Sequence, residues 1–451
     1  MSSLDQRIAS LNSAQRRAVN AITGGWDSPN GDFYFPIIEG PPGTGKTYIG
    51  TVAAAKYLND RGGDCQIAYL CYTNLASDRA LDGLVNLRLS PDQVVRVAET
   101  AQRRNYQRNR NYGYYFFYDD ENELLESQKR RLRNTPVLIT TLLSANKILR
   151  YQSKPLIIID EFSQVPPHLF FSTISKVRTK EKHNPEGYTL LGDPDQLPYT
   201  TSQPLLRPNI GLFIAQRHNY EPHQLEIQYR MHPTICQTVN ALRQALNTYP
   251  LSSHPSTTSK NLLTDGYIWD PSTIPQNLLE IIQPANNCVI IDTDHLPGYE
   301  QVGIGQSSYY SSEAILTSKI AQYLNASYSK PNGEKLLPVI ISPYNAQIGV
   351  IKNNLPEVLA SQCISVHQSQ GREYPCVIIS FTRKNEEHRI GFLGQELLRA
   401  QTYVACSRAE SKLIILLSKS TFYGHGFTDF DNLIDGSKGA LFIDAERSWI
   451  E

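Results

Sequence analysis

The sequence predicts an α/β protein with two domains in series, each built on a parallel sheet. Short β-branched runs alternate with helical patterns along most of the chain. The runs are apolar throughout, which is typical of parallel strands buried on both faces between helices. They fall into two sets separated near residues 200–230. We therefore place the first domain at residues 1–224 and the second at residues 225–451.

The expected strands follow one another in chain order. The first set comprises residues 36–40, 66–71, 136–141, 156–160 and 189–193. The second set comprises residues 288–292, 338–342, 363–366, 377–382 and 412–418. Two stretches interrupt the alternation: a charged insertion at about residues 98–135, and a Ser/Thr/Pro/Asn-rich excursion at about residues 249–287. Such compositions favour loops over packed elements.

Composition excludes several classes of protein. The 451 residues include 43 Lys and Arg against 43 Asp and Glu, so net charge alone does not hold this chain on nucleic acid. No run approaches the roughly 20 apolar residues that a membrane span requires. The N-terminus lacks the apolar core of a signal peptide. We expect a cytoplasmic or nuclear protein with no membrane partner.

The seven cysteines are dispersed, and no two of them form a CxxC pair. An odd, scattered set argues against a disulfide framework and against a structural zinc site. We expect reduced cysteines that serve as small core residues.

The strongest motif is a phosphate-binding loop at residues 40–47, which fits G-x-x-x-x-G-K-[ST] in full. Gly43, Thr44 and Gly45 would let backbone N–H groups curl around phosphate oxygens at the start of a helix. Lys46 would reach the terminal phosphates of ATP, and the Thr47 hydroxyl would coordinate Mg²⁺.

A pair of carboxylates follows the strand at residues 156–160. Asp160 is placed to hold Mg²⁺, and Glu161 is placed to act as general base on the attacking water. Acidic pairs at strand ends are common, so this pair indicates a catalytic site only in combination with the phosphate loop. Together the two motifs indicate a nucleoside triphosphate hydrolase, without saying what the hydrolysis drives.

Further motifs follow in a fixed order, at residues 160–164, 191–198, 228–233, 342–347, 366–373 and 404–409. In this order they closely resemble superfamily 1 helicases. The best match is the branch containing the nonsense-mediated-decay helicase, senataxin and the nidovirus helicases. The resemblance spans roughly residues 11–418 and implies two RecA-like domains with ATP bound in the cleft between them.

The resemblance also implies roles for individual residues. Gln15 would read adenine with its amide, and Tyr229 would stack on the adenine ring. Gln196 would be the coupling glutamine, in contact with the γ-phosphate or the attacking water. Glu373 belongs to a motif of the second domain that would touch both nucleotide and nucleic acid.

Two arginines complete the nucleotide site that the resemblance implies. Arg230 and Arg408 would serve as arginine fingers, since a planar guanidinium suits the charge of a transferring phosphoryl group. Supplying them from the second domain would make catalysis depend on closure of the cleft.

A single-stranded nucleic acid is the expected partner, either RNA or DNA. The positions that match the family's contacts are Thr73, Asn74, Thr140, Thr141, Pro343, Tyr344 and His367. Hydroxyls, amides and backbone N–H groups bind phosphates without reading sequence. An aromatic ring such as that of Tyr344 can stack on a base, while a strand-end threonine can equally be a simple cap.

Residues 103–112 interleave arginine with tyrosine and amides, a mixture suited to phosphates and bases. Five carboxylates follow within residues 119–126, so a self-neutralising hairpin or loop is an equal alternative.

The chain also departs from the family pattern. Gln15 lies close to Met1, leaving no room before it for the stalk and Cys/His-rich zinc domain that relatives carry; a minimal motor or a fragment would fit. Phe162 replaces a small residue, His367 stands where an aspartate is common, and Tyr403 stands where an asparagine is common. These changes touch packing more than chemistry.

The favoured interpretation is an ATP-dependent helicase or translocase, with 5′-to-3′ travel implied by the branch. The alternative is a nucleic-acid-stimulated ATPase that remodels nucleoprotein complexes without unwinding. The intact catalytic motifs argue against a binding module with a dead nucleotide site. A small-molecule kinase would not need the motifs around Arg230 and Arg408.

Overall fold

The computed structural model describes residues 3–24, 36–62, 65–98, 113, 115–118, 125–178, 186–199, 210–218, 221–395 and 400–451. The chain divides into two compact units. Unit 1 comprises Met1–Pro194 and Pro198–Leu225, and unit 2 comprises Asp195–Leu197 and Glu226–Glu451. The chain therefore enters unit 2 for three residues, returns to unit 1, and then remains in unit 2.

Unit 1 is built on an eight-stranded sheet of order β4-β3-β5-β2-β6-β7-β1-β8, and every adjacent pair in it is parallel. The strands are β1 (Ile37–Glu39), β2 (Gln66–Cys71), β3 (Val94–Ala98), β4 (Phe116–Tyr118), β5 (Val137–Thr141), β6 (Pro155–Asp160), β7 (Gly187–Gly192) and β8 (His223–Gln224).

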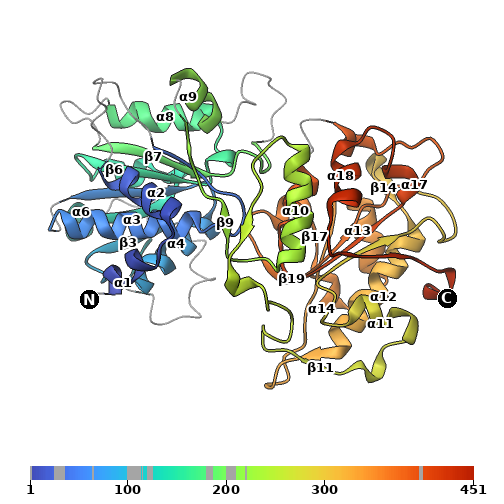
Figure 1. Ribbon diagram of the computed structural model, residues 1–451. Coiled ribbons are helices and arrows are strands. Elements are labelled where there is room, and N and C mark those ends of the chain that lie inside the picture. The colour runs from blue at the N-terminus through green and yellow to red at the C-terminus, as the bar shows by residue number, and fades with distance from the viewer. Residues whose placement is uncertain are drawn as a thin grey trace. The chain divides into compact units, whose positions relative to one another are not determined.

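Helices cover both faces of this sheet (Figure 1). Alternate strand residues such as Ile67 and Tyr69 pack with one group of helices, while their neighbours Ala68 and Leu70 pack with the other. The first group is α1 (Ser3–Ser10), α2 (Ser13–Gly24), α3 (Lys46–Asp60) and α4 (Asn74–Asn86). The second group includes α6 (Glu126–Asn134), α7 (Asn146–Leu149), α8 (Pro167–Arg178) and α9 (Ile210–His218), with the 3-10 helices η3 (Leu142–Ser144) and η4 (Phe162–Gln164).

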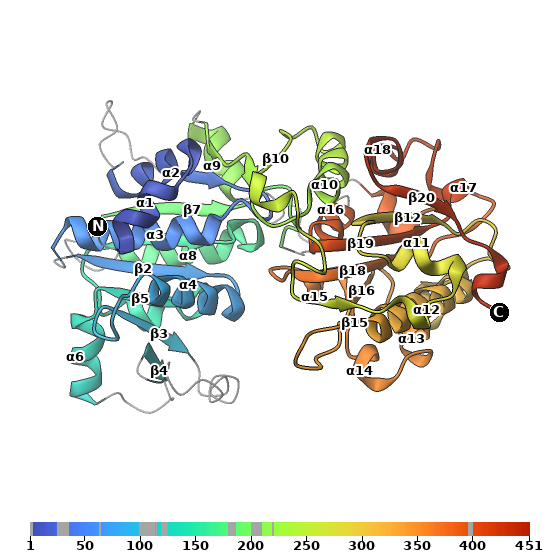
Figure 2. The same cartoon turned by 60° about the horizontal axis from the view of Figure 1, so that its bottom comes forward.

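Unit 2 is built on a six-stranded parallel sheet of order β17-β16-β18-β19-β12-β20 (Figure 2). Its strands are β12 (Cys288–Asp292), β16 (Val339–Ser342), β17 (Cys363–Ser365), β18 (Tyr374–Ser380), β19 (Ala409–Leu417) and β20 (Leu441–Asp444). Three short pairs stand apart from it: β9 (Ile227–Gln228) with β10 (Ser252–Ser253), β11 (Ile268–Trp269) with β15 (Tyr328–Ser329), and β13 (Gln301–Val302) with β14 (Ser308–Tyr309).

Two layers of helices enclose this second sheet as well. One layer contains α10 (Pro233–Ala245), α15 (Val366–Ser369), α16 (Ala400–Cys406), α17 (Lys419–Phe422) and α18 (Thr428–Gly436). The other contains α11 (Leu279–Ile282), α12 (Ser311–Ser327), α13 (Asn345–Asn353) and α14 (Glu357–Ala360). Short 3-10 helices join these elements: η6 (Pro255–Thr257), η7 (Pro271–Thr273), η8 (Gln276–Leu278), η9 (Ile304–Gln306), η10 (Gly391–Gly394) and η12 (Arg447–Trp449).

The prediction of an α/β fold with two parallel sheets is confirmed, and each predicted run contains a strand. Several strand ends were wrong by one to three residues, and two of them have a local explanation in the structure. Val366 begins α15, because the Ser365 hydroxyl accepts a hydrogen bond from the backbone N–H of Gln368 and caps a helix there. Phe381 and Thr382 lie beyond β18, and Thr382 has a φ of 77° that a strand does not allow. The sequence analysis also missed the short or edge strands β3, β4, β8 and β20.

The arginine- and tyrosine-rich segment at residues 103–112 lies outside the described residues. All seven cysteines are free thiols, and all except the half-buried Cys65 are buried. Across the described ranges, none of the helices has both the length and the apolar character needed to cross a bilayer.

Candidate functional site

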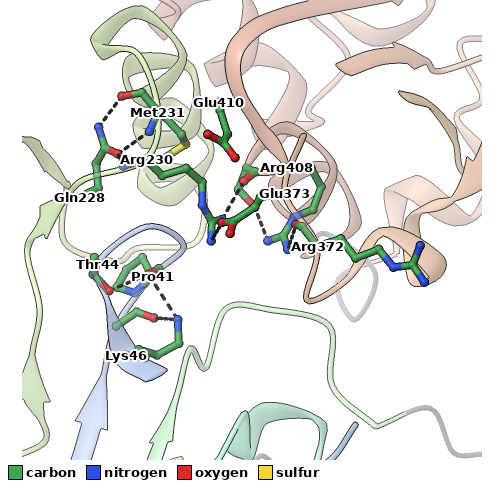
Figure 3. Close-up of polar contacts among 12 residues, drawn as sticks. Pro41, Thr44, Lys46, Gln228, Arg230, Met231, Arg372, Glu373, Arg408 and Glu410 are labelled. Carbon is green, nitrogen blue, oxygen red and sulfur yellow. Dashed lines mark hydrogen bonds and ion pairs between the residues drawn. The ribbon is translucent and has the colours of Figure 1, made fainter. Parts of the chain in front are cut away.

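The phosphate loop joins the end of β1 to the start of α3 in unit 1. Gly43 and Gly45 have φ angles of 82° and 86°, a left-handed conformation that glycine adopts without steric cost. The Lys46 ammonium donates hydrogen bonds to the main-chain carbonyl of Gly40 and, at 3.3 Å, to that of Pro41 (Figure 3). The cation thus rests on the loop itself, at the position from which it would meet a phosphate.

The Thr47 hydroxyl and the Asp160 carboxylate lie together, as the sequence predicted for the two metal-binding groups. Thr47 Oγ1 donates to Asp160 Oδ2 over 2.8 Å, and the Tyr69 hydroxyl donates to the same oxygen over 3.1 Å. Burial raises the pKa of Asp160, while these hydrogen bonds and the charge of Lys46 oppose the rise. A hydroxyl beside a carboxylate is a ligand set that fits Mg²⁺ bound together with phosphate oxygens.

Glu161 occupies a strained backbone position directly after Asp160, with a φ of 61°. Gln164 Nε2 donates to its carboxylate over 3.3 Å. The next residue, Phe162, is fully buried. Its ring fits because Gly192 and Gly211, which have no Cβ, lie against it. A Cβ added to Gly192 would lie 2.5 Å from the ring, and a Cβ added to Gly211 would lie 2.4 Å from it. These glycines account for the large residue that follows the acidic pair.

The Gln15 side chain contacts the phosphate loop. Its Nε2 donates to the Thr44 carbonyl over 3.1 Å, and its Oε1 accepts from the backbone N–H of Asn12 over 3.2 Å. Gln15 is 5% exposed. The amide therefore lies at the phosphate loop. To bind adenine with both its nitrogen and its oxygen, Gln15 would have to give up its hydrogen bonds with Thr44 and Asn12.

In unit 2, Gln228 organises the loop that carries Tyr229 and Arg230. Its Oε1 accepts from the backbone N–H groups of Arg230 and Met231, at 2.8 Å and 2.7 Å, and its Nε2 donates to the Met231 carbonyl at 2.8 Å (Figure 3). The ring of Tyr229 stacks on that of His254, with centroids 4.5 Å apart. Sequence reasoning did not assign Gln228 a role, although its place in the Q-Y-R-M-H-P motif was a signal.

The two candidate arginine fingers lie on either side of Ser407. Arg230 Nη2 forms an ion pair with Glu373 Oε2 at 2.5 Å, and its Nη1 donates to the Ser407 carbonyl at 3.4 Å. Arg408 donates to the Val404 and Arg372 carbonyls, at 2.9 Å and 3.1 Å, and to the Ser407 hydroxyl at 2.8 Å.

Burial distinguishes these arginines from an ordinary surface pair. Arg408 is 2% exposed, and the Arg230 side chain is 17% exposed. Two guanidinium groups are thus concentrated in one half-buried place, close to the Glu373 carboxylate that offsets part of their charge. Gln196, the remaining candidate, lies between Asp195 and Leu197 in the same unit.

The candidate nucleic-acid positions of unit 1 follow strands that end at one edge of the sheet, where Cys71, Thr141 and Asp160 are in register. Thr73 caps α4 by accepting from the backbone N–H of Ala76. Asn74 is exposed, and its Oδ1 accepts from the buried Arg96, a residue that no sequence signal marked.

Thr140 is a correction to the sequence analysis. It is fully buried, and its hydroxyl donates to the Val97 carbonyl, so it does not face a strand of nucleic acid in this structure. Its neighbour Thr141 is half-buried at the strand end. The alternation of side chains along a strand explains why only one of two adjacent threonines reaches the surface.

Tyr344 is the second correction. Its ring is 4% exposed and packs on Phe392, with centroids 4.8 Å apart, and its hydroxyl donates to the Ile390 carbonyl. It is a core residue in this arrangement, not a surface for stacking a base. Pro343 is half-buried and His367 is exposed, and both follow strands that end in register at Ser342 and Ser365.

Comparison with known proteins agrees with this architecture. Two family models, each described as an AAA domain, match residues 34–202 and 211–420. The DNA replication ATP-dependent helicase/nuclease JHS1 of Arabidopsis thaliana is 28% identical over 434 residues, which cover 91% of this chain and 28% of that protein. The regulator of nonsense transcripts 1 homolog of the same plant is 24% identical over 456 residues, covering 91% of this chain and 32% of the relative. These matches support the assignment of the chain to the superfamily 1 helicases.

Among solved structures, the arterivirus nonstructural protein 10 helicase, in complex with DNA, aligns with 89% of this chain and 61% of its own, at 13% identity and a TM-score of 0.43. The family models and the curated relatives confirm the predicted resemblance to superfamily 1 helicases. The chain spans less than a third of the length of either plant relative.

Proposed function

We propose that the chain is an ATP-dependent helicase or translocase on single-stranded nucleic acid, travelling 5′ to 3′. The observation that carries this proposal is the convergence of Arg230 and Arg408 on Ser407, in a unit whose sequence has no phosphate loop of its own. Arginines that belong to a different unit from the phosphate loop suit a motor, because hydrolysis then requires the two units to act together.

Within this proposal most of the residues that bind and orient ATP come from unit 1, while Tyr229 and Gln196 come from unit 2. Lys46 leaves its carbonyl partners for the terminal phosphates, and Gln15 and Tyr229 contact the adenine. Thr47 and Asp160 would hold Mg²⁺, which would neutralise phosphate charge. Glu161 orients the attacking water and accepts its proton, and Gln196 senses the γ-phosphate.

The residues of unit 2 complete the reaction. Arg230 exchanges the Glu373 carboxylate for phosphoryl oxygens, and Arg408 contributes a second cation. The candidate polymer contacts are Thr73, Asn74, Thr141, Pro343 and His367, which touch phosphates and sugars without reading sequence. Relatives named as DNA replication helicase/nucleases make single-stranded DNA the first polymer to test.

The deciding experiment measures ATP hydrolysis by the wild type, by Glu161→Gln and by the control Asp60→Asn, which alters an exposed carboxylate paired with Lys56. Each protein is tested without polymer, with single-stranded RNA and with single-stranded DNA. We expect stimulation by a polymer in the wild type and in the control, and its loss in Glu161→Gln. Hydrolysis indifferent to both polymers would overturn the proposal.

Direction and unwinding are tested on duplexes that carry a single-stranded tail at either the 5′ or the 3′ end. A 5′-to-3′ motor separates the 5′-tailed duplex. Preference for the 3′ tail would reverse the proposed direction. Polymer-stimulated hydrolysis without separation of either duplex would favour the alternative, an ATPase that remodels nucleoprotein complexes.

A further inference from the structure

Arg243, near the end of α10, is a fully buried arginine that the motifs do not include. The residue is 1% exposed. Its Nε donates to the Tyr249 carbonyl at 2.8 Å, and its Nη1 donates to Asp195 Oδ2 at 3.1 Å and to the Tyr403 hydroxyl at 3.2 Å. The guanidinium also lies over the Tyr249 ring, 4.7 Å from its centroid. An arginine is buried at such cost only where several partners compensate the lost hydration.

The partners of Arg243 adjoin the candidate catalytic groups. Asp195 directly precedes Gln196. Tyr403 lies on α16, the helix that leads into Arg408, and α10 itself begins three residues after Arg230. One side chain therefore links the three segments that present Gln196, Arg230 and Arg408.

The segment around Gln196 is held at both ends within unit 2. Asp195 is bound by Arg243 on one side. On the other side the Leu197 carbonyl accepts from Gln370 Nε2 at 3.3 Å, and the Leu197 side chain is buried in the core of unit 2. The chain enters unit 2 for these three residues only, before returning to unit 1. Gln196 thus moves with unit 2 as long as these anchors hold.

We propose that Arg243 is a positioning residue that fixes Gln196 to the unit carrying the arginine fingers. The assignment rests on the proposed function, since it assumes that Gln196 senses the γ-phosphate. The guanidinium, which belongs to α10, binds Asp195, next to Gln196, and Tyr403 on α16. These three segments therefore move together. When a polymer shifts unit 2, Gln196 shifts with the two arginines. Without the link, ATP still binds in unit 1, but the polymer no longer accelerates hydrolysis.

The test compares Asp195→Asn, Arg243→Gln and the double variant with the wild type. Asp195→Asn removes the carboxylate charge with little change of side-chain shape, so it tests the proposal even if Arg243→Gln fails to fold. The matched control is Lys260→Gln, which removes another partly buried ion pair of unit 2, with Glu410. The measured quantities are the kcat and the KM for ATP, with and without single-stranded DNA, together with the melting temperature.

We expect each single variant to lower the polymer-stimulated kcat by about tenfold, within the range typical of coupling between two sites. The basal rate and the KM for ATP should stay within about twofold of the wild type, a split that simple loss of folded protein does not produce. The double variant should be no worse than Arg243→Gln alone, because that variant already removes the ion pair that Asp195→Asn weakens. Lys260→Gln should retain its stimulation.

Three outcomes would count against the assignment. Full stimulation in both folded single variants would overturn it, as would additive losses in the double variant. An equal loss in Lys260→Gln would overturn it too, since any buried ion pair would then suffice. A wild type that no polymer stimulates would instead overturn the proposed function, and this assignment with it.

Discussion

The two units hold their proposed catalytic cations, Lys46 and Arg408, in contrasting ways. Lys46 is half-buried and rests on two carbonyls of its own loop, five and six positions away along the chain. Arg408 is almost fully buried and binds Val404, Ser407 and Arg372, the last of them 36 positions away. The first cation could exchange these two carbonyls of its own loop for a ligand, and neither hydrogen bond reaches a distant segment of the chain. The second is part of the packing of its unit, so its function and its contribution to stability are joined.

The largest effect expected from this contrast is that of Lys46→Ala. Removal of the ammonium should lower the kcat for ATP hydrolysis by at least about 1,000-fold, because phosphoryl transfer depends on electrostatic stabilisation. The melting temperature should change little, since the two backbone carbonyls that accept from Lys46 lie five and six positions away, within its own loop. Lys56→Ala, on the same helix, should leave both quantities unchanged. Unfolding of Lys46→Ala would contradict the contrast between Lys46 and Arg408.

Replacement of the residue behind the acidic pair should affect stability instead. Phe162→Ala leaves a cavity beside Gly192 and Gly211, so the free energy of unfolding should fall by about 3 to 5 kcal/mol. Chemical denaturation measures this loss. The control is Phe171→Ala, whose side chain is 50% exposed and should cost far less. Equal losses in the two variants would contradict the packing described for Phe162.

Arg408→Lys should lower activity and stability together. A lysine keeps the charge but does not reproduce the planar set of donors that contacts three partners. We expect a kcat about 100-fold lower and an unfolding free energy lower by about 2 kcal/mol. Arg447→Lys, which alters an exposed ion pair with Glu451, is the control. If Arg408→Lys lost activity while its stability was unchanged, the two units would not differ as stated.

The smallest effect concerns Glu313, a fully buried carboxyl on α12 of unit 2. Burial raises its pKa from 4.5 to about 7, although Ser380 and Thr382 donate hydrogen bonds to it. The folded state therefore favours the protonated form, and stability is lost as the pH rises from the unfolded pKa through the folded one.

Between pH 5 and pH 8 this loss should be about 2 kcal/mol relative to Glu313→Gln, which does not titrate. The difference in unfolding free energy between the two proteins, measured across this interval, tests the assignment. Glu280→Gln, at an exposed position, should follow the wild type. Parallel pH profiles for the wild type and Glu313→Gln would show that the buried carboxyl has no such pKa.

The success of sequence reasoning also differed between the units. That Thr47 of the phosphate loop and Asp160 lie together could be predicted, because each follows from a short local pattern next to an apolar strand. The partners of Arg243 lie 48 and 160 positions away, and no local pattern joins them. Tyr344 and Thr140 were assigned to a surface because a motif states which residue is present, while burial depends on the packing of segments such as residues 390–392.

The backbone at Glu161 has a consequence for how this sequence can change. A non-glycine residue in the left-handed region costs about 1 kcal/mol or more, and glycine there would relieve that cost. Glu161→Gly should therefore melt at a higher temperature than Glu161→Gln, although both lack the carboxylate. Selection of libraries for heat tolerance alone would enrich small residues at this position. Only a screen that also demands turnover would retain the glutamate.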